Sequence, residues 1–251
     1  MYDDDDLKLT DPVAQLDDPL DHIPPVNEDA EESQCDPEAL LVMLDAPEAQ
    51  QRMLAARAFC EFEEPRAVNR LIELLQDSCP LVRVSAAYAL GRNSSDDAIA
   101  PLIAQMRDWN GYVRKGVVWA LGNSRNPAAL MPLIEALKTD IPAVRLWAAS
   151  ALAQMGSVSY ETVVAAVPPM IEVMRRDPIA AVRSNCAWAL GELCRELPSN
   201  VIYATAIDAL VETFAEDEDL GVREDARAAI LKVGDPRGLQ IIEELEQDGW
   251  F

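Results

Sequence analysis

The chain lacks the short motifs that mark common catalytic and nucleotide-binding sites. It has no GxxxxGKS or GxxxxGKT loop, no GxGxxG after a predicted strand, no HExxH pair, and a single histidine, His22. One histidine alone supports neither a general base nor a metal site. These absences argue against hydrolase and nucleotide-binding functions, and we expect no catalytic residues.

Positive charge is also scarce, with 21 Lys and Arg against 44 Asp and Glu and a formal net charge of −23. Proteins that bind nucleic acid or anionic membranes neutralise phosphates with Lys and Arg, so this balance argues against both partners. No segment approaches 18 consecutive apolar residues, and we expect no membrane insertion. The acidic N-terminus differs from a basic, apolar targeting peptide, and we expect a cytoplasmic protein.

The five cysteines are an odd number, without a CxxC pair or a second cluster of metal ligands. Cys186 and Cys194 are eight residues apart on one predicted helix, and Cys79 lies in a predicted turn. In a long chain this spacing favours reduced thiols over a disulfide framework. We therefore expect no metal ion and no cofactor.

Residues 1–34 hold twelve Asp or Glu against one Lys, with four prolines. Such a stretch buries too little apolar surface to offset the entropy of ordering. It predicts an acidic disordered tail, followed by a folded domain at 35–251. Two interpretations of the tail remain: a solvated segment that keeps the protein soluble, or a motif that folds against a basic partner or along the protein's own groove.

One pattern recurs from residue 36 onward. It is clearest in PLVRVSAAYALG (80–91), GYVRKGVVWALG (111–122), PAVRLWAASALA (142–153) and AAVRSNCAWALG (180–191), with weaker copies at 49–60 and 220–231. The shared arginines, spaced by 31, 31, 31, 38 and 40 residues, are Arg52, Arg83, Arg114, Arg145, Arg183 and Arg223. A repeat of this length predicts a stack of identical supersecondary units.

Each copy has the periodicity of one helix face. Small or apolar residues follow the arginine by three, four and seven positions, as in Ala86, Ala87 and Leu90. A second apolar-periodic segment precedes the copies, at 67–75, 98–106, 129–137, 163–174 and 206–214. Every repeat is therefore predicted to be a helical hairpin.

A lone hairpin cannot bury its apolar stripe, so neighbouring hairpins must stack and share one core. We predict an all-α fold, a right-handed α–α superhelix of six hairpins beginning at 36–44, with a capping helix at 236–247. The two longest spacings predict longer helices rather than a new fold. Gly91, Gly122 and Gly191 stand where left-handed residues are expected to end three of the helices.

The arginine column suggests a ligand site for phosphate or acidic groups, but a structural role is favoured. An Asp lies five or six residues before most of these arginines, in the turn between the paired helices. There its carboxylate accepts from exposed backbone N–H groups and meets an arginine of its own or the next repeat. The predicted ladder consists of Arg52, Asp77, Arg83, Asp108, Arg114, Asp140, Arg145, Asp177, Arg183, Asp217 and Arg223.

Aromatic residues follow several arginines by five positions, about 140° from the core direction at 100° per residue. Second helices line the concave side of such stacks, so these rings are predicted to face a groove. The predicted partner-binding residues are Tyr88, Tyr112, Lys115, Trp119, Trp147, Asn185 and Trp188. Aromatic side chains with little charge nearby are typical of protein-binding hot spots. The alternative is packing between repeats, because a ring at the edge of one helix can cover the next.

The motif PLVRVSAAYALG with the following DDAIAPLIAQM resembles the phycobilin-lyase-type HEAT-like repeats, over residues 36–235. That family includes the paired lyase subunits that attach bilins to phycobiliproteins, factors in phycobilisome turnover, and general adaptors. The run RKGVVWALGN is also similar to a cyanobacterial HEAT protein that partners the iron–sulfur assembly protein IscA. The resemblance implies a HEAT-like solenoid with a protein partner, such as a phycobiliprotein, a lyase subunit or IscA.

The sequence therefore favours a non-enzymatic scaffold or adaptor that binds a protein in its concave groove, in phycobilisome-related or iron–sulfur assembly processes. The alternative, implied by one branch of the resemblance, is a phycobilin lyase subunit with bilin as its only cofactor. A bilin propionate needs an exposed cation beside an aromatic wall, and Lys115 with Trp119 is the predicted place for it.

Overall fold

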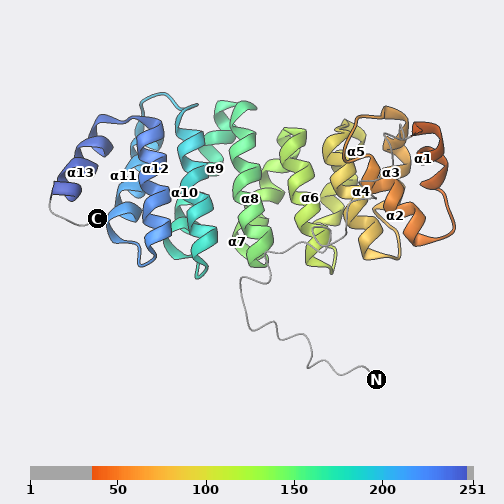
Figure 1. The fold of residues 1–251 in the computed structure, drawn as a ribbon. Coiled ribbons are helices and arrows are strands. Elements are labelled where there is room, and N and C mark those ends of the chain that lie inside the picture. The colour runs from red at the N-terminus through yellow and green to blue at the C-terminus, as the bar shows by residue number, and fades with distance from the viewer. Residues whose placement is uncertain (1–35, 248–251) are drawn as a thin grey trace, which may run out of the picture.

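A computed structural model describes residues 36–247. The predicted tail, residues 1–34 with His22, lies outside the described residues, and so does Cys35. All regular structure within residues 36–247 is helical, with helices α1 to α13 following one another along a single elongated row (Figure 1). None of the described helices is long and apolar enough to cross a lipid bilayer.

The helices pair into six hairpins with a closing helix after them. The first helices are α1 (Pro37–Met43), α3 (Val68–Leu74), α5 (Asp96–Gln105), α7 (Leu130–Thr139), α9 (Tyr160–Arg176) and α11 (Val201–Glu216). The second helices are α2 (Ala49–Ala58), α4 (Pro80–Arg92), α6 (Gly111–Ser124), α8 (Pro142–Gln154), α10 (Ala180–Cys194) and α12 (Leu220–Val233), and α13 (Pro236–Gln247) closes the stack. The predicted α-solenoid of six hairpins and a C-terminal cap is confirmed.

The hairpins stack in two layers, one of first helices and one of second helices. The second helices pack on one another in an unbroken row from α2 to α12, more closely than the first helices do. In a curved stack the more closely packed row lies on the inside. The second helices therefore line the concave face, as the repeat pattern predicts.

The core lies between these two layers. The residue seven positions after each repeat arginine is at most 1% exposed, at Phe59, Leu90, Leu121, Leu152, Leu190 and Ile230. The two longest repeat spacings are accommodated in the first helices, because α9 has 17 residues and α11 has 16, whereas α5 and α7 have 10 each. The extra residues lengthen existing helices.

Glycines allow the second helices to approach closely. A Cβ at Gly91 would lie 2.9 Å from the Cα of Ala120, and a Cβ at Gly122 would lie 2.8 Å from the Cα of Ala151. Both contacts are with the backbone of the next helix, which cannot move aside alone.

The prediction that Gly91, Gly122 and Gly191 are left-handed caps is wrong. All three lie inside helices, and α4, α6 and α10 end one to three residues later. The positive φ angles among the described residues belong to Arg125 and Gly234. The glycines are needed at these positions for helix contact rather than for chain reversal.

Candidate functional site

The repeat arginines form ion pairs from one repeat to the next. Arg83 donates from Nε to Asp108 Oδ2 at 2.6 Å and from Nη2 to Oδ1 at 3.0 Å. Its Nη1 donates to the carbonyl oxygen of Asp77 at 2.8 Å, in the turn of its own hairpin. Asp108 Oδ1 also accepts from the backbone N–H of Asn110 at 2.8 Å. Each arginine thus ties its own turn to the turn of the following repeat.

This arrangement recurs at each of the five interfaces between successive repeats. The closest N–O distances are 2.5 to 2.8 Å in the pairs Arg52–Asp77, Arg83–Asp108, Arg114–Asp140, Arg145–Asp177 and Arg183–Asp217. Arg223 donates instead to the carbonyl oxygens of Phe214 and Ala215, at 2.9 Å each. These guanidinium groups are engaged within the stack, so the geometry favours structural pairing over an anion site.

Two of the aromatic residues pack on each other. The ring centroids of Tyr88 on α4 and Trp119 on α6 are 5.3 Å apart at an interplanar angle of 55°, and both residues are half-buried. Gly91 makes room for the Trp119 ring, and Gly116 lies against the Tyr88 ring. Tyr88 and Trp119 therefore join neighbouring repeats while keeping part of each side chain at the surface.

Lys115 is 4% exposed, and its ammonium group lies 5.4 Å above the ring centre of Trp147. A cation over an indole face is attracted by the quadrupole of the ring. The side chain is thus turned into the stack rather than extended as an open cation beside Trp119, and Trp147 itself is half-buried. Tyr112, at the start of α6, is half-buried and packs against the core.

Asn185 and Trp188 lie on the surface of α10. Asn185 donates from Nδ2 to the carbonyl oxygen of Leu146 at 2.6 Å and to Ser150 Oγ at 2.7 Å, both on α8. Trp188, one turn later, is 42% exposed. They line a shallow hollow of about 670 Å³ between α8, α10 and α12, here called the concave hollow, formed by Leu146, Ser150, Ala181, Ser184, Asn185, Trp188 and Asp225.

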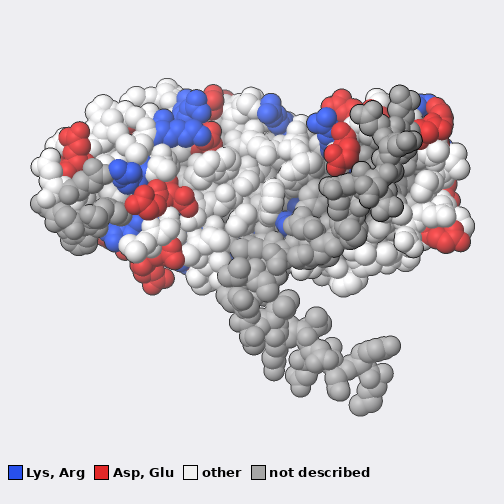
Figure 2. Space-filling model, viewed as in Figure 1, with Lys and Arg blue, Asp and Glu red and all other residues white. Residues whose placement is uncertain are grey.

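The concave hollow lies on a face with little charge at its centre. Figure 2 shows few Lys, Arg, Asp or Glu on this face around α8, and charges of both signs along one edge and toward α12. An exposed aromatic ring in a hollow with little charge is typical of the centre of a protein interface. The site can bind a partner by burying Trp188.

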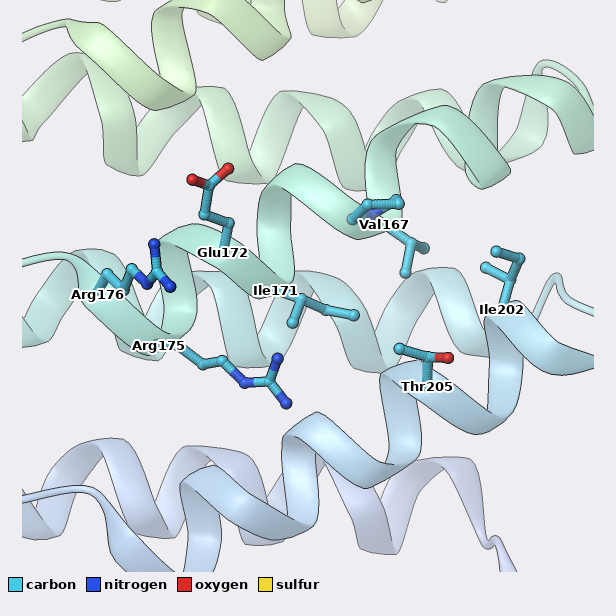
Figure 3. Close-up of a pocket in the computed structure, with 8 residues that line it drawn as sticks. Val167, Ile171, Glu172, Arg175, Arg176, Ile202 and Thr205 are labelled. Carbon is cyan, nitrogen blue, oxygen red and sulfur yellow. The ribbon is translucent and has the colours of Figure 1, made fainter.

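Another hollow, of about 360 Å³, lies in the layer of first helices between α9 and α11. Val167 and Ile171 of α9 and Ile202 of α11 line it (Figure 3). Arg175 at its edge pairs with Glu212, and Glu172 pairs with Lys138. Two of the charged side chains at this rim, Arg175 and Glu172, are thus paired within the chain.

The sequence prediction missed Asp225, Ser150 and Leu146, which the fold brings to the concave hollow. Asp225 follows Arg223 by two residues, which is the position of Asn185 and Trp147 in earlier repeats. Comparing the residues two positions after each repeat arginine would have found Asp225. The aromatic pattern alone passes over it, because a carboxylate on a surface helix is ordinarily only a solvated charge.

A family model described as HEAT repeats matches residues 37–108, 99–191 and 167–250. Among solved structures, the chain is similar to an engineered protein, with 25% identity, a TM-score of 0.59, and coverage of 79% of this chain and 98% of that one. A designed armadillo repeat protein in complex with the peptide (KR)4 is 21% identical, with a TM-score of 0.60 and coverage of 78% and 98%.

The chain is also similar to the complex of CpcE and CpcF of phycocyanin lyase from Nostoc sp. PCC7120. The identity is 23% and the TM-score 0.58, with coverage of 87% of this chain and 85% of that one. No curated protein matches the chain in sequence. The structural likenesses agree with a helical-repeat solenoid.

Proposed function

Because the chain belongs to the HEAT-repeat family, we propose that it is a non-enzymatic scaffold that binds a protein partner in the concave hollow. The observation that carries this proposal is the position of Trp188, which is 42% exposed in a hollow lined by uncharged side chains and one carboxylate, Asp225. Burying a large aromatic side chain contributes more to association than most other contacts. Because Asp225 is the one charged residue that lines the concave hollow, few charges have to be desolvated on docking.

The stack beneath the concave hollow is suited to presenting it rigidly. Asn185 links α10 to α8 directly under the surface, and the ion pairs of Arg145 and Arg183 fix the turns on either side. A preorganised surface loses less conformational entropy on binding. We infer that the partner docks on a surface whose shape is already formed.

The proposal is tested by affinity capture from native cells with the full-length chain and two matched variants. Trp188→Arg places a charged side chain in the concave hollow, and Met131→Arg places one on α7, where Met131 is 66% exposed. Both variants are expected to keep the fold, which circular dichroism and the melting temperature check. Partners lost only with Trp188→Arg support the proposal, whereas partners lost only with Met131→Arg contradict it.

We further propose that the partner belongs to phycobilisome-related processes or to iron–sulfur assembly. The support is the resemblance of the repeat motifs to phycobilin-lyase-type repeats and of RKGVVWALGN to an IscA-partnering protein. Purified phycobiliprotein, lyase subunit and IscA can each be titrated against the chain by calorimetry. Saturable binding of one of them, weakened by Trp188→Arg, identifies the process. Absence of binding to all three excludes these partners.

A second candidate function is a subunit of a phycobilin lyase. It is supported by the repeat resemblance and by the likeness to the CpcE and CpcF complex over most of both chains. The predicted bilin contact at Lys115 does not fit, because Lys115 is buried over Trp147 and offers no open cation to a propionate. Visible absorbance that co-elutes with the protein after mixing with bilin would support this function, and a flat spectrum would exclude it.

A further inference from the structure

Residues at two fixed positions meet across the interfaces between second helices. The residue two positions after a repeat arginine lies against the residue five positions after the arginine of the preceding repeat. Gly116 thus lies against Tyr88, where a Cβ would be 3.3 Å from the ring. Asn185 bonds to Ser150 in the same way, at 2.7 Å. In both cases the two residues contact each other, so each has a partner within the chain.

At the last of these interfaces the same two positions hold Asp225 on α12 and Trp188 on α10. Both line the concave hollow, and both side chains are exposed. Neither residue makes a side-chain hydrogen bond, ion pair or ring contact with any other of residues 36–247. Within residues 36–247, an indole and a carboxylate that line the same hollow, both open to solvent, are therefore left without a partner.

Two of the other described tryptophans, Trp109 and Trp147, have a cation over the ring. The guanidinium carbon of Arg83 lies 5.7 Å from the ring centre of Trp109, and Lys115 Nζ lies 5.4 Å from that of Trp147. Trp119 is covered by the Tyr88 ring instead. Among the tryptophans that the structure describes, Trp188 alone has neither a cation over its ring nor a contact with another ring, although Trp109 is more exposed, at 77% against 42%.

We propose that Trp188 and Asp225 bind an arginine side chain of the protein partner. The proposal rests on the concave hollow being the partner site and names the chemistry that it recognises. A planar guanidinium stacks on an indole while its edge donates to a carboxylate, which an ammonium group does less well. The net charge of −23 favours approach of a basic segment.

The test follows the five tryptophan indole N–H resonances of the full-length protein by NMR, assigned with Trp→Phe variants. The probe is the capped peptide acetyl-Gly-Ala-Arg-Ala-Gly-amide at millimolar concentration, with matched peptides that carry citrulline or lysine in place of arginine. Citrulline keeps the shape of arginine and removes its charge. We expect the arginine peptide to shift the Trp188 resonance saturably and to leave that of Trp109 unchanged.

The lysine peptide is expected to bind about threefold more weakly than the arginine peptide, and the citrulline peptide about tenfold more weakly. Asp225→Asn should weaken the arginine peptide about threefold. The matched control Glu73→Gln removes one exposed charge from α3, in the opposite layer, and should change the affinity less than 1.5-fold, or about 0.2 kcal/mol.

Equal shifts of Trp188 with the arginine and citrulline peptides would overturn the arginine inference and leave the concave hollow as a partner site. No shift with any of the three peptides would also overturn it, and the capture experiment with Trp188→Arg would still decide the proposed function. Equal weakening by Asp225→Asn and Glu73→Gln would assign the attraction to net charge and remove Asp225 from the site.

Discussion

Arg83 and Asp108 form a two-point ion pair between residues 25 positions apart, with N–O distances of 2.6 and 3.0 Å. Their side chains are 8% and 5% exposed, so solvent and salt screen the pair weakly. Because Arg83 also holds the carbonyl oxygen of Asp77, each such pair sets the position of one repeat on the next. The concave face depends on this positioning.

Removing an arginine of the ladder should destabilise the fold. Arg114→Ala leaves the carboxylate of Asp140 half-buried without its guanidinium partner, and we expect the free energy of unfolding to fall by about 2 kcal/mol. Urea denaturation measures this change. The control is Arg107→Ala, at an exposed position just before α6, which should change the free energy of unfolding by less than about 0.5 kcal/mol. A larger effect of Arg114→Ala on partner affinity than on stability would contradict the structural role.

The ladder also predicts a pH dependence. Burial raises the pKa of Asp77, but hydrogen bonds from Arg52 and from the Cys79 backbone N–H outweigh it, so the pKa lies below its usual value. A carboxyl group with a lowered pKa in the folded state stabilises the fold above its unfolded pKa of about 3.9, and the stabilisation is lost as the pH falls through the folded value.

Arg52→Gln removes the side-chain donor to Asp77. The difference in unfolding free energy between wild type and this variant should be largest at about pH 7 and should shrink below about pH 4. What remains at low pH comes from the hydrogen bonds of Arg52 to the carbonyl oxygens of Ala46 and Pro47, which do not titrate. Urea denaturation at several pH values measures it. A difference that stays constant down to about pH 3 would show that Asp77 does not titrate against Arg52.

The buried Cys186 and Cys194 and the half-buried Cys60 should be inert in the native protein. Burial raises the pKa of Cys60 and of Cys194 to about 12 in each case, and raises that of Cys186 as well. Because the thiolate is the reactive form, iodoacetamide at about pH 8 should modify these three only after unfolding. Peptide mass spectrometry of native and denatured samples tests this. Fast native modification of Cys186 would mean that α10 opens readily.

Because α4 and α6 approach closely at Gly91, we predict that this position does not tolerate a side chain larger than hydrogen. Gly91→Ala places a Cβ 2.3 Å from the Trp119 ring and 2.9 Å from the Ala120 Cα, and we expect a loss of about 2 kcal/mol. The control Gly221→Ala, at an exposed position at the start of α12, should change stability by less than about 1 kcal/mol. Equal effects of the two substitutions would mean that the second helices are less tightly packed than described.

The solenoid could be predicted because each repeat carries the same helical period. Leu121 and Leu152 follow their arginines by seven residues, and that spacing alone places them on the buried face. Stacking then follows, because no single hairpin covers these leucines. The role of Gly91 could not be predicted in this way, since a glycine near a helix end is usually read as a cap.

The candidate site was less predictable. A helical wheel gives the direction of Trp119 and Lys115 from their own helix axis, but not what the neighbouring helix places there. Tyr88 covers one and Trp147 the other. Trp188 was predicted to face the groove and is exposed there, whereas its neighbour Asp225 depends on the contact between α10 and α12, which sequence spacing does not specify.

The central claim is that a protein partner docks in the concave hollow, and site-specific photo-crosslinking tests it most directly. Benzoyl-phenylalanine would be placed at Ser184, in the concave hollow, and at Met131, on the layer of first helices. We predict that the captured partner crosslinks from position 184 and not from position 131, and that Trp188→Arg abolishes the crosslink. Crosslinking from position 131 alone would contradict the account and assign partner binding to the opposite layer.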